Sequence, residues 1–198
     1  MNHPVQPVQN EGLDASALRQ QLEHNHVAAF GWALSCCRGQ RTDAEDVLQN
    51  AYFKILTGKA QFAGRAEFKT WLFAVIRKTA IDAHRRVLFR RAWLLMFALR
   101  REPDEPFEPS GAGANDRQSM QELFQRALAG LPPRQREVLH LVFYQQMSVQ
   151  QAADVMGVSV GSARQHYERA KRRLHVQLSA SPVFHESGLA RSKTRPAV

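Results

Sequence analysis

A stretch rich in proline, glycine and acid divides this chain of 198 residues into two parts. Residues 102–116 contain three prolines, two glycines and five acidic residues, and they contain no lysine or arginine. Such a segment is too polar and too interrupted to form a packed element, so we interpret it as a flexible acidic linker. The parts on either side are each long enough for one small domain.

Both parts show the periodicity of helices, and neither shows a convincing strand pattern. Apolar residues recur at steps of three and four, which is the spacing of an amphipathic helix. We therefore predict an all-α fold of two small helical domains joined by the acidic linker, with a helix-turn-helix in the second domain. The predicted boundaries are a disordered leader at 1–12, a first domain at 13–100, the linker at 101–117, a second domain at 118–178 and a mobile basic tail at 179–198.

Charge and cysteine usage limit the classes of function. The net charge of +9 favours a polyanionic partner, with nucleic acid first and an anionic membrane second. The apolar run at residues 92–99 is far shorter than the roughly 20 residues that span a bilayer, and the N-terminus does not resemble a signal peptide, so stable membrane insertion is not expected.

The adjacent Cys36 and Cys37 would close a strained disulfide, so we expect reduced thiols in a cytoplasmic protein. At least one of the two is predicted to pack in a helix core, with a redox or metal role as the alternative. No spacing typical of metal ligands, cofactor binding or a nucleophile–base pair is present, so neither a cofactor nor enzymatic catalysis is expected.

The first domain is predicted to hold three helical stretches. The pattern from Leu13 to about Leu56 is helical, with a break at 39–41, and a helix starts again at Thr42 or Asp43, either of which can cap it. A long helix then runs from about Glu67 through the arginines near residue 91. The stripe expected to face the core in the first stretch consists of Leu18, Leu22, His26, Ala29 and Ala33.

The second domain contains the local chemistry of a helix-turn-helix. Ser148 and Gln151 form a capping box, which starts a helix. Gly157 can take the left-handed conformation that ends it, and Ser159 can cap the next helix. In that second helix, the apolar stripe falls on Ala163, Tyr167, Ala170 and Leu174.

The other face of this second helix is basic, and in this motif its N-terminal end enters the major groove. Arginine and glutamine there can make bidentate contacts to guanine and adenine. The candidate DNA-binding residues of the second domain are Ser159, Ser162, Arg164, Gln165, Arg169, Lys171 and Arg172.

From Leu131 to Leu174 the sequence resembles the C-terminal promoter-binding domain of extracytoplasmic-function sigma factors. In that family the second helix of the motif reads the minus-thirty-five promoter element. Output domains of LuxR-type response regulators share a similar motif, so a stand-alone helix-turn-helix regulator is the alternative function.

Two segments of the first domain also resemble this family. Residues 43–55 are similar to the segment that docks on the clamp helices of the largest subunits of core RNA polymerase. The resemblance implies core-polymerase contacts by Asp43, Asp46, Gln49, Asn50 and Phe53, although many members have glutamate in place of Asn50.

Residues 62–86 are similar to the segment that reads the minus-ten element and helps to open promoter DNA. The resemblance implies DNA contacts by Phe62, Arg77, Lys78, Arg85 and Arg86, whereas Phe68, Trp71 and Leu72 are expected to be core residues.

The order of these segments along the chain implies a sigma factor. Its expected partners are core RNA polymerase, promoter DNA and an anti-sigma factor. Residues 87–99 are unusually apolar for the end of the basic helix. They are expected either to pack on the first domain or to be covered by an inhibitor protein.

Overall fold

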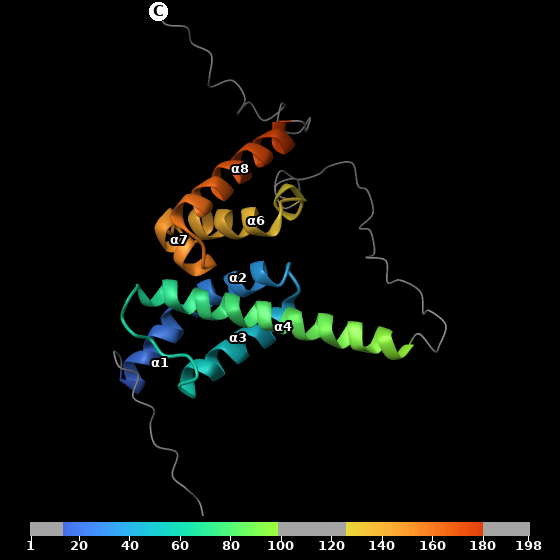
Figure 1. Ribbon diagram of the computed structural model, residues 1–198. Coiled ribbons are helices and arrows are strands. Elements are labelled where there is room, and N and C mark those ends of the chain that lie inside the picture. Colours follow the sequence, from blue (N-terminus) through green and yellow to red (C-terminus); the bar gives the residue numbers. More distant parts are fainter. Residues whose placement is uncertain (1–13, 99–125, 180–198) are drawn as a thin grey trace, which may run out of the picture.

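The computed structural model describes residues 14–98 and 126–179, and every regular element in these residues is a helix (Figure 1). This confirms the predicted fold class. The predicted leader, the linker and nearly all of the predicted tail lie outside the described residues. Within the described residues, none of the helices combines the length and the apolar character needed to cross a bilayer.

The first domain is built from four helices: α1 (Ala15–His24), α2 (His26–Cys36), α3 (Arg41–Leu56) and α4 (Phe68–Ala98). Helices α2, α3 and α4 pack on one another in all three combinations. At their centre the buried Trp32 stacks on Phe73 with ring centroids 5.9 Å apart, and its indole Nε1 donates a hydrogen bond of 3.0 Å to the Phe73 carbonyl oxygen. The bond satisfies the polar atom of a fully buried tryptophan.

Three helix boundaries differ from the prediction. The first stretch is broken at Asn25, where the side-chain amide donates to the carbonyl of Gln21 and so competes with continued helix. As a result, Leu18, Leu22, Ala29 and Ala33 are buried, but His26 is exposed. The predicted start of α3 at Thr42 or Asp43 was wrong, because α3 starts at Arg41 after Gln40, which makes no side-chain cap. Helix α4 is longer than predicted and reaches Ala98.

The second domain consists of residues 126–129, which are helical, α6 (Pro133–Leu139), the π-helix η1 (His140–Tyr144), α7 (Val149–Met156) and α8 (Val160–Ser179). No feature of the sequence predicted the π-helix. In it, the amide of Gln145 donates to the carbonyl of His140, which is the long hydrogen bond of a π-turn.

The helix-turn-helix prediction is confirmed in detail. Ser148 and Gln151 form both hydrogen bonds of the capping box. Gly157 is left-handed, with φ 63° and ψ 43°. The amides of Gly157 and Val158 donate to the carbonyls of Asp154 and Ala153, which is the bonding pattern of a Schellman motif. The turn therefore has a defined geometry, and it sets the angle between α7 and α8.

The two domains pack against each other, with α7 against α4 (Figure 1). Their buried apolar residues form one continuous cluster, in which Leu72, Phe73 and Ile76 of α4 join Val155 and Met156 of α7. We call this contact the seam. It is the feature that positions the predicted DNA-binding residues relative to one another.

Candidate nucleic-acid interface

The N-terminal turn of α8 is ordered by a cap and open to solvent. The hydroxyl of Ser159 accepts a hydrogen bond of 3.2 Å from the amide of Ser162, as predicted for a cap, and the two hydroxyls lie 2.9 Å apart. Arg164 and Gln165 follow in the next turn, and both are exposed. Ala163 and Ala170 are buried on the opposite side, with Tyr167 and Leu174 partly buried along the same stripe. The apolar stripe therefore fixes the helix so that its polar face is free to contact DNA.

The remaining predicted residues of α8 differ in their availability. Arg169 and Arg172 are exposed. Lys171 is exposed as well, but its Nζ lies 2.8 Å from a carboxylate oxygen of Glu168 and 4.8 Å from the centroid of the Tyr167 ring. The hydrogen bond to Glu168 raises the pKa of Lys171, so this side chain is a cation that already has a partner.

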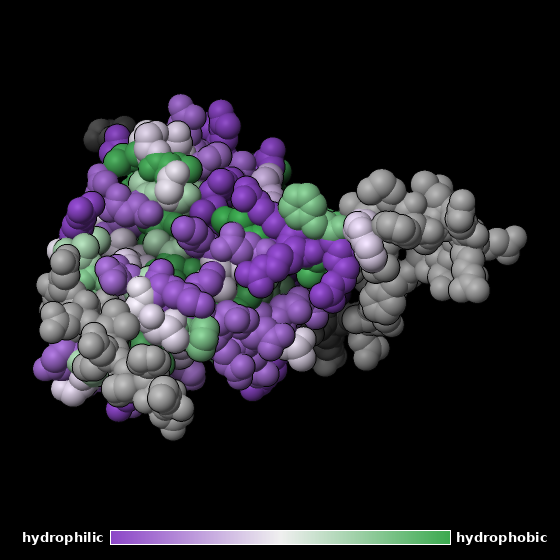
Figure 2. Space-filling view, turned by 60° about the horizontal axis from the view of Figure 1, so that its bottom comes forward, coloured by the Kyte–Doolittle hydropathy of each residue, from purple (hydrophilic) through white to green (hydrophobic). Residues whose placement is uncertain are grey.

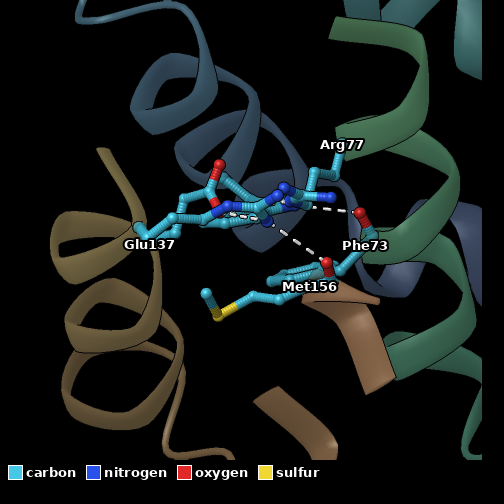
Figure 3. A network of polar contacts seen from close by, with 6 residues as sticks. Phe73, Arg77, Glu137 and Met156 are labelled. Atoms are coloured by element: carbon cyan, nitrogen blue, oxygen red, sulfur yellow. Dashed lines mark hydrogen bonds and ion pairs between the residues drawn. The ribbon is translucent and has the colours of Figure 1, made fainter. Parts of the chain in front are cut away.

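On α4, three of the predicted DNA-binding residues, Lys78, Arg85 and Arg86, are exposed. Arg77 is different, because it is 9% exposed and lies in the seam. Its Nε donates to the Glu137 carboxylate of α6 at 3.2 Å. Arg134 also lies 3.6 Å from that carboxylate and donates to the carbonyl of Met156, so Glu137 is held between two guanidinium groups (Figure 3).

Two further hydrogen bonds cross the seam near the start of α4. Lys69 donates from Nζ to the carbonyl of Gln145 at 3.1 Å, and Gln151 donates from Nε2 to Glu67 at 2.8 Å. Gln151 thus serves both the capping box and the domain contact. In the structure, Arg77 is therefore held at the contact between the domains.

Phe62 lies in an aromatic cluster of the first domain. Its ring centroid is 5.5 Å from that of Phe68 and 5.3 Å from that of Trp71. Leu72, next to this cluster, is fully buried, and Phe68 and Trp71 are partly buried, in agreement with their expected structural role. Phe62 is itself partly buried. An unpaired base would therefore contact the exposed edge of this aromatic cluster and not a single isolated ring.

The five residues predicted to contact core polymerase lie on one exposed face of α3. Asp43, Asp46, Gln49, Asn50 and Phe53 follow one another at steps of three and one, and all are exposed. Asn50 donates its amide to the carbonyl of Asp46 at 2.7 Å, and Lys59 covers the Phe53 ring at 5.3 Å from its centroid. The opposite face of α3 carries buried residues such as Val47 and Ala51, so its orientation is fixed by the core.

The two cysteines are free thiols at the C-terminal end of α2. Burial and the nearby carboxylate of Glu137 raise the pKa of Cys36 well above its usual value, and burial raises that of Cys37 to about 11. Both are therefore protonated and poorly nucleophilic near neutral pH. Among the described residues, no group of histidine, cysteine and acidic side chains has the arrangement of a metal site.

Sequence reasoning missed the residues of the second domain that form the seam. Glu137 and His140 lie on α6 and η1, and their partners Arg77 and Trp32 are more than 50 residues away along the chain. The centroids of His140 and Trp32 are 5.3 Å apart, and burial lowers the pKa of His140 to about 4. The only local signal was the acidic Glu137 beside an otherwise basic stretch at 134–136.

Fold and site together define a two-domain helical protein with a helix-turn-helix and exposed basic residues on two long helices. Comparison with protein families agrees. The model described as "Sigma-70 region 2" matches residues 22–88, and that described as "Sigma-70, region 4" matches residues 121–174. Together these matches cover more than half of the chain, and the chain belongs to the sigma-70 family of sigma factors, within its extracytoplasmic-function group.

Curated relatives point the same way. The chain is 29% identical over 156 residues to the ECF RNA polymerase sigma factor SigG of Mycobacterium tuberculosis, which covers 69% of this chain but only 42% of SigG. It is 30% identical over 135 residues to SigM of the same organism, covering 67% of this chain and 62% of SigM. RNA polymerase sigma factor SigV of Bacillus subtilis is 24% identical over 137 residues, covering 69% and 76%.

Two solved structures resemble the fold. One is CnrH in complex with the cytosolic domain of CnrY, with a TM-score of 0.58, 26% identity and coverage of 87% of this chain and 93% of that chain. The other is the sigma factor RpoE in complex with the anti-sigma factor NepR from Bartonella quintana, with a TM-score of 0.59, 23% identity and coverage of 83% and 98%. The second likeness is one of fold alone.

Proposed function

We propose that this chain is a promoter-specificity subunit of RNA polymerase. It binds the core enzyme through the exposed face of α3, reads the minus-thirty-five element with α8 and the minus-ten element with α4, and has no catalytic activity of its own. The observation that carries the proposal is the combination of these three surfaces on one chain. A stand-alone regulator needs only the helix-turn-helix and has no use for the polar face of α3.

The polymerase-docking face is supported by its composition and its rigidity. Asp43 and Asp46 supply negative charge, Gln49 and Asn50 supply amides, and Phe53 adds an aromatic side chain that is 57% exposed. A polar rim with an aromatic anchor is a common composition for protein interfaces. The fixed orientation of α3 lets these groups meet a partner with little loss of entropy.

The promoter-reading role requires the seam to open. Positions minus-thirty-five and minus-ten are about 25 base pairs apart, which corresponds to roughly 85 Å of duplex. Helices α4 and α7 are in direct contact in the structure, so α4 and α8 cannot serve both elements in this arrangement. The 27 residues from 99 to 125 are long enough to span at most roughly 89–97 Å, which is enough to join the separated domains.

Opening also releases Arg77. In the packed arrangement the guanidinium group of Arg77 forms an ion pair with Glu137, so it is not available to neutralise a DNA phosphate. The packed form is therefore the resting form, and the polymerase-bound form is the separated one. The two similar structures, RpoE and CnrH, were solved with an anti-sigma factor and with the cytosolic domain of CnrY, respectively. We infer that an anti-sigma factor likewise controls this cytoplasmic protein.

Run-off transcription tests the proposal. Purified chain is added to core polymerase with a library of genomic promoter fragments, and the same fragments are tested for binding by the chain alone. We expect transcripts that depend on the chain and weak binding to isolated duplex. Tight sequence-specific binding without polymerase, together with no run-off product, would instead establish a stand-alone regulator.

A further inference from the structure

The last three turns of α4 form an apolar and basic projection beyond the body of the protein. The sigma-70 region 2 match ends at residue 88, yet α4 continues to Ala98. Figure 1 shows this end of α4 running on past α3, away from the packed helices. The projection is thus an addition to the part that resembles the family model.

Large apolar side chains are exposed all around this part of the helix. Val87, Leu88 and Phe89 are 48%, 50% and 74% exposed, and Trp93 is 57% exposed. Three consecutive helical residues point in directions about 100° apart, so no single stripe contains them. Figure 2 shows hydrophobic surface among hydrophilic residues on the side where α4 leads into the grey residues. Of the two expectations for residues 87–99, packing on the first domain does not fit the exposed Val87, Leu88 and Phe89, and covering by an inhibitor protein stays untested.

The charges of the projection all have one sign. From Arg85 to Ala98 the sequence contains four arginines, no lysine and no acidic residue. Among them, Arg85, Arg86 and Arg90 are described and exposed. An occupant of this surface must therefore offer both apolar contact and negative charge.

We propose that this projection binds the surface of an anionic phospholipid membrane. A protein groove covers one stripe of a helix, which leaves the other exposed apolar residues in water. A helix lying in the bilayer interface is submerged by about 5–10 Å, and because a helix is about 10 Å across, most of its sides are covered. Tryptophan and phenylalanine favour this interface, and arginine side chains reach the lipid phosphates from it.

This binding is attachment to a surface and not insertion, since the described helices include none that could cross a bilayer. It also has a consequence for DNA. Arg85 and Arg86 lie at the root of the projection and are predicted to contact promoter DNA, so lipid and DNA would compete for the same side of α4. The membrane would then hold the protein away from promoters. Membrane binding itself does not depend on the proposed function, whereas the competition with DNA rests on it.

Sedimentation with vesicles tests the proposal on the full chain. The probes are vesicles of phosphatidylglycerol mixed with phosphatidylcholine, and vesicles of phosphatidylcholine alone, both at physiological ionic strength. The test variant is the double substitution Phe89→Ser and Trp93→Ser. The matched control is Phe143→Ser, which removes an aromatic side chain of similar exposure, 64%, from the second domain.

We expect the native chain and Phe143→Ser to sediment with the anionic vesicles and not to bind the neutral ones. The double variant should bind the anionic vesicles more weakly by roughly tenfold or more, because binding strength follows the apolar area buried. All three proteins should have the same circular dichroism spectrum and the same run-off activity without vesicles.

Three results would overturn the proposal. The first is no binding of the native chain to anionic vesicles, which would leave a protein partner as the occupant. The second is equal binding to anionic and neutral vesicles. The third is native binding by the double variant, since net charge alone would then account for the attraction.

Discussion

Replacing Arg77 with glutamine removes the ion pair that crosses the seam. The Nε–Oε2 distance to Glu137 is 3.2 Å, and the two side chains are 11% and 19% exposed. A hydrogen bond to a charged group contributes about 1.5–3 kcal/mol, and breaking a fully buried pair costs about 3–5 kcal/mol. Glu137 keeps Arg134 at 3.6 Å, so it is not left alone. We therefore expect a loss of about 2 kcal/mol, which shifts the domains about 30-fold toward separation.

The thiol of Cys36 reports this separation. Cys36 is partly buried, and it packs against the apolar core that the second domain shares with α2. An alkylating reagent reaches it more readily when the seam opens, so the labelling rate rises with the open population. The assay is done in a Cys37→Ser background, and the rate should rise in Arg77→Gln by up to about 30-fold.

The charge effect of the substitution on the Cys36 thiol works in the opposite direction, so faster labelling can be attributed to opening of the seam. Arg77 lowers the pKa of Cys36, so its removal raises that pKa and slows the reaction of the packed form. The control is Lys78→Gln, which removes a neighbouring charge that is exposed and outside the seam contacts. If Arg77→Gln is labelled no faster than Lys78→Gln, the ion pair does not hold the domains together.

Four further predictions concern other parts of the molecule. Asp46→Arg should abolish co-purification with core polymerase without changing the circular dichroism spectrum, and a folded variant that still co-purifies would contradict the docking face on α3. Arg164→Ala and Gln165→Ala should each change base preference in a promoter-variant assay by about 1–3 kcal/mol. Lys171→Ala should instead weaken binding to all sequences alike, and a uniform loss in all three variants would contradict this division into base contacts and phosphate contacts. Gly157→Ala should lower the free energy of unfolding by about 1–2 kcal/mol because φ is 63° there. The control Gly31→Ala, with nothing within 4 Å of the added Cβ, should be neutral or stabilising. Equal changes in the urea midpoint of the two variants would refute the requirement for a left-handed residue at position 157. Burial lowers the pKa of His140 to about 4, and in the unfolded chain it is about 6.5, so the unfolded state binds more protons between these values and stability falls as the pH drops through them. Between pH 7.5 and pH 5 the native chain should lose of the order of 1–2 kcal/mol more than His140→Gln does, and an equal loss in both would show that His140 is not the group responsible.

The features that the sequence predicted well depend on neighbours along the chain. Ser148 and Gln151 are three residues apart and form both bonds of their capping box, and Gly157 is the residue type that its backbone conformation requires. The residues of the exposed face of α3 were implied by the family resemblance, and their helical spacing places them on one side. Such patterns can be read from one sequence because all the atoms involved lie within one or two helical turns.

The features that it missed depend on distant partners or on small energy differences. Arg77 and Glu137 are 60 residues apart, so the sequence could not show that Arg77, a predicted DNA contact, pairs with Glu137 in the seam. The break at Asn25 and the start of α3 at Arg41 have no strong signal, because several residues there could cap or end a helix at similar cost. The length of α4 beyond residue 91 could not be inferred, because the apolar run at 92–99 shows no periodic stripe that would indicate a continuing helix.

The π-helix at His140–Tyr144 makes the spacing between α6 and the helix-turn-helix tolerant of one deletion. A π-turn holds one residue more than an α-helical turn. Deleting one residue there, such as Val142, would let the segment close as regular α-helix while the residues on either side keep their directions. Met147 would stay in the core, and α8 would present the same side to DNA. Among related sequences, we therefore expect a deletion of one residue in this segment more often than in α7 or α8, where it would rotate the rest of the helix by about 100°.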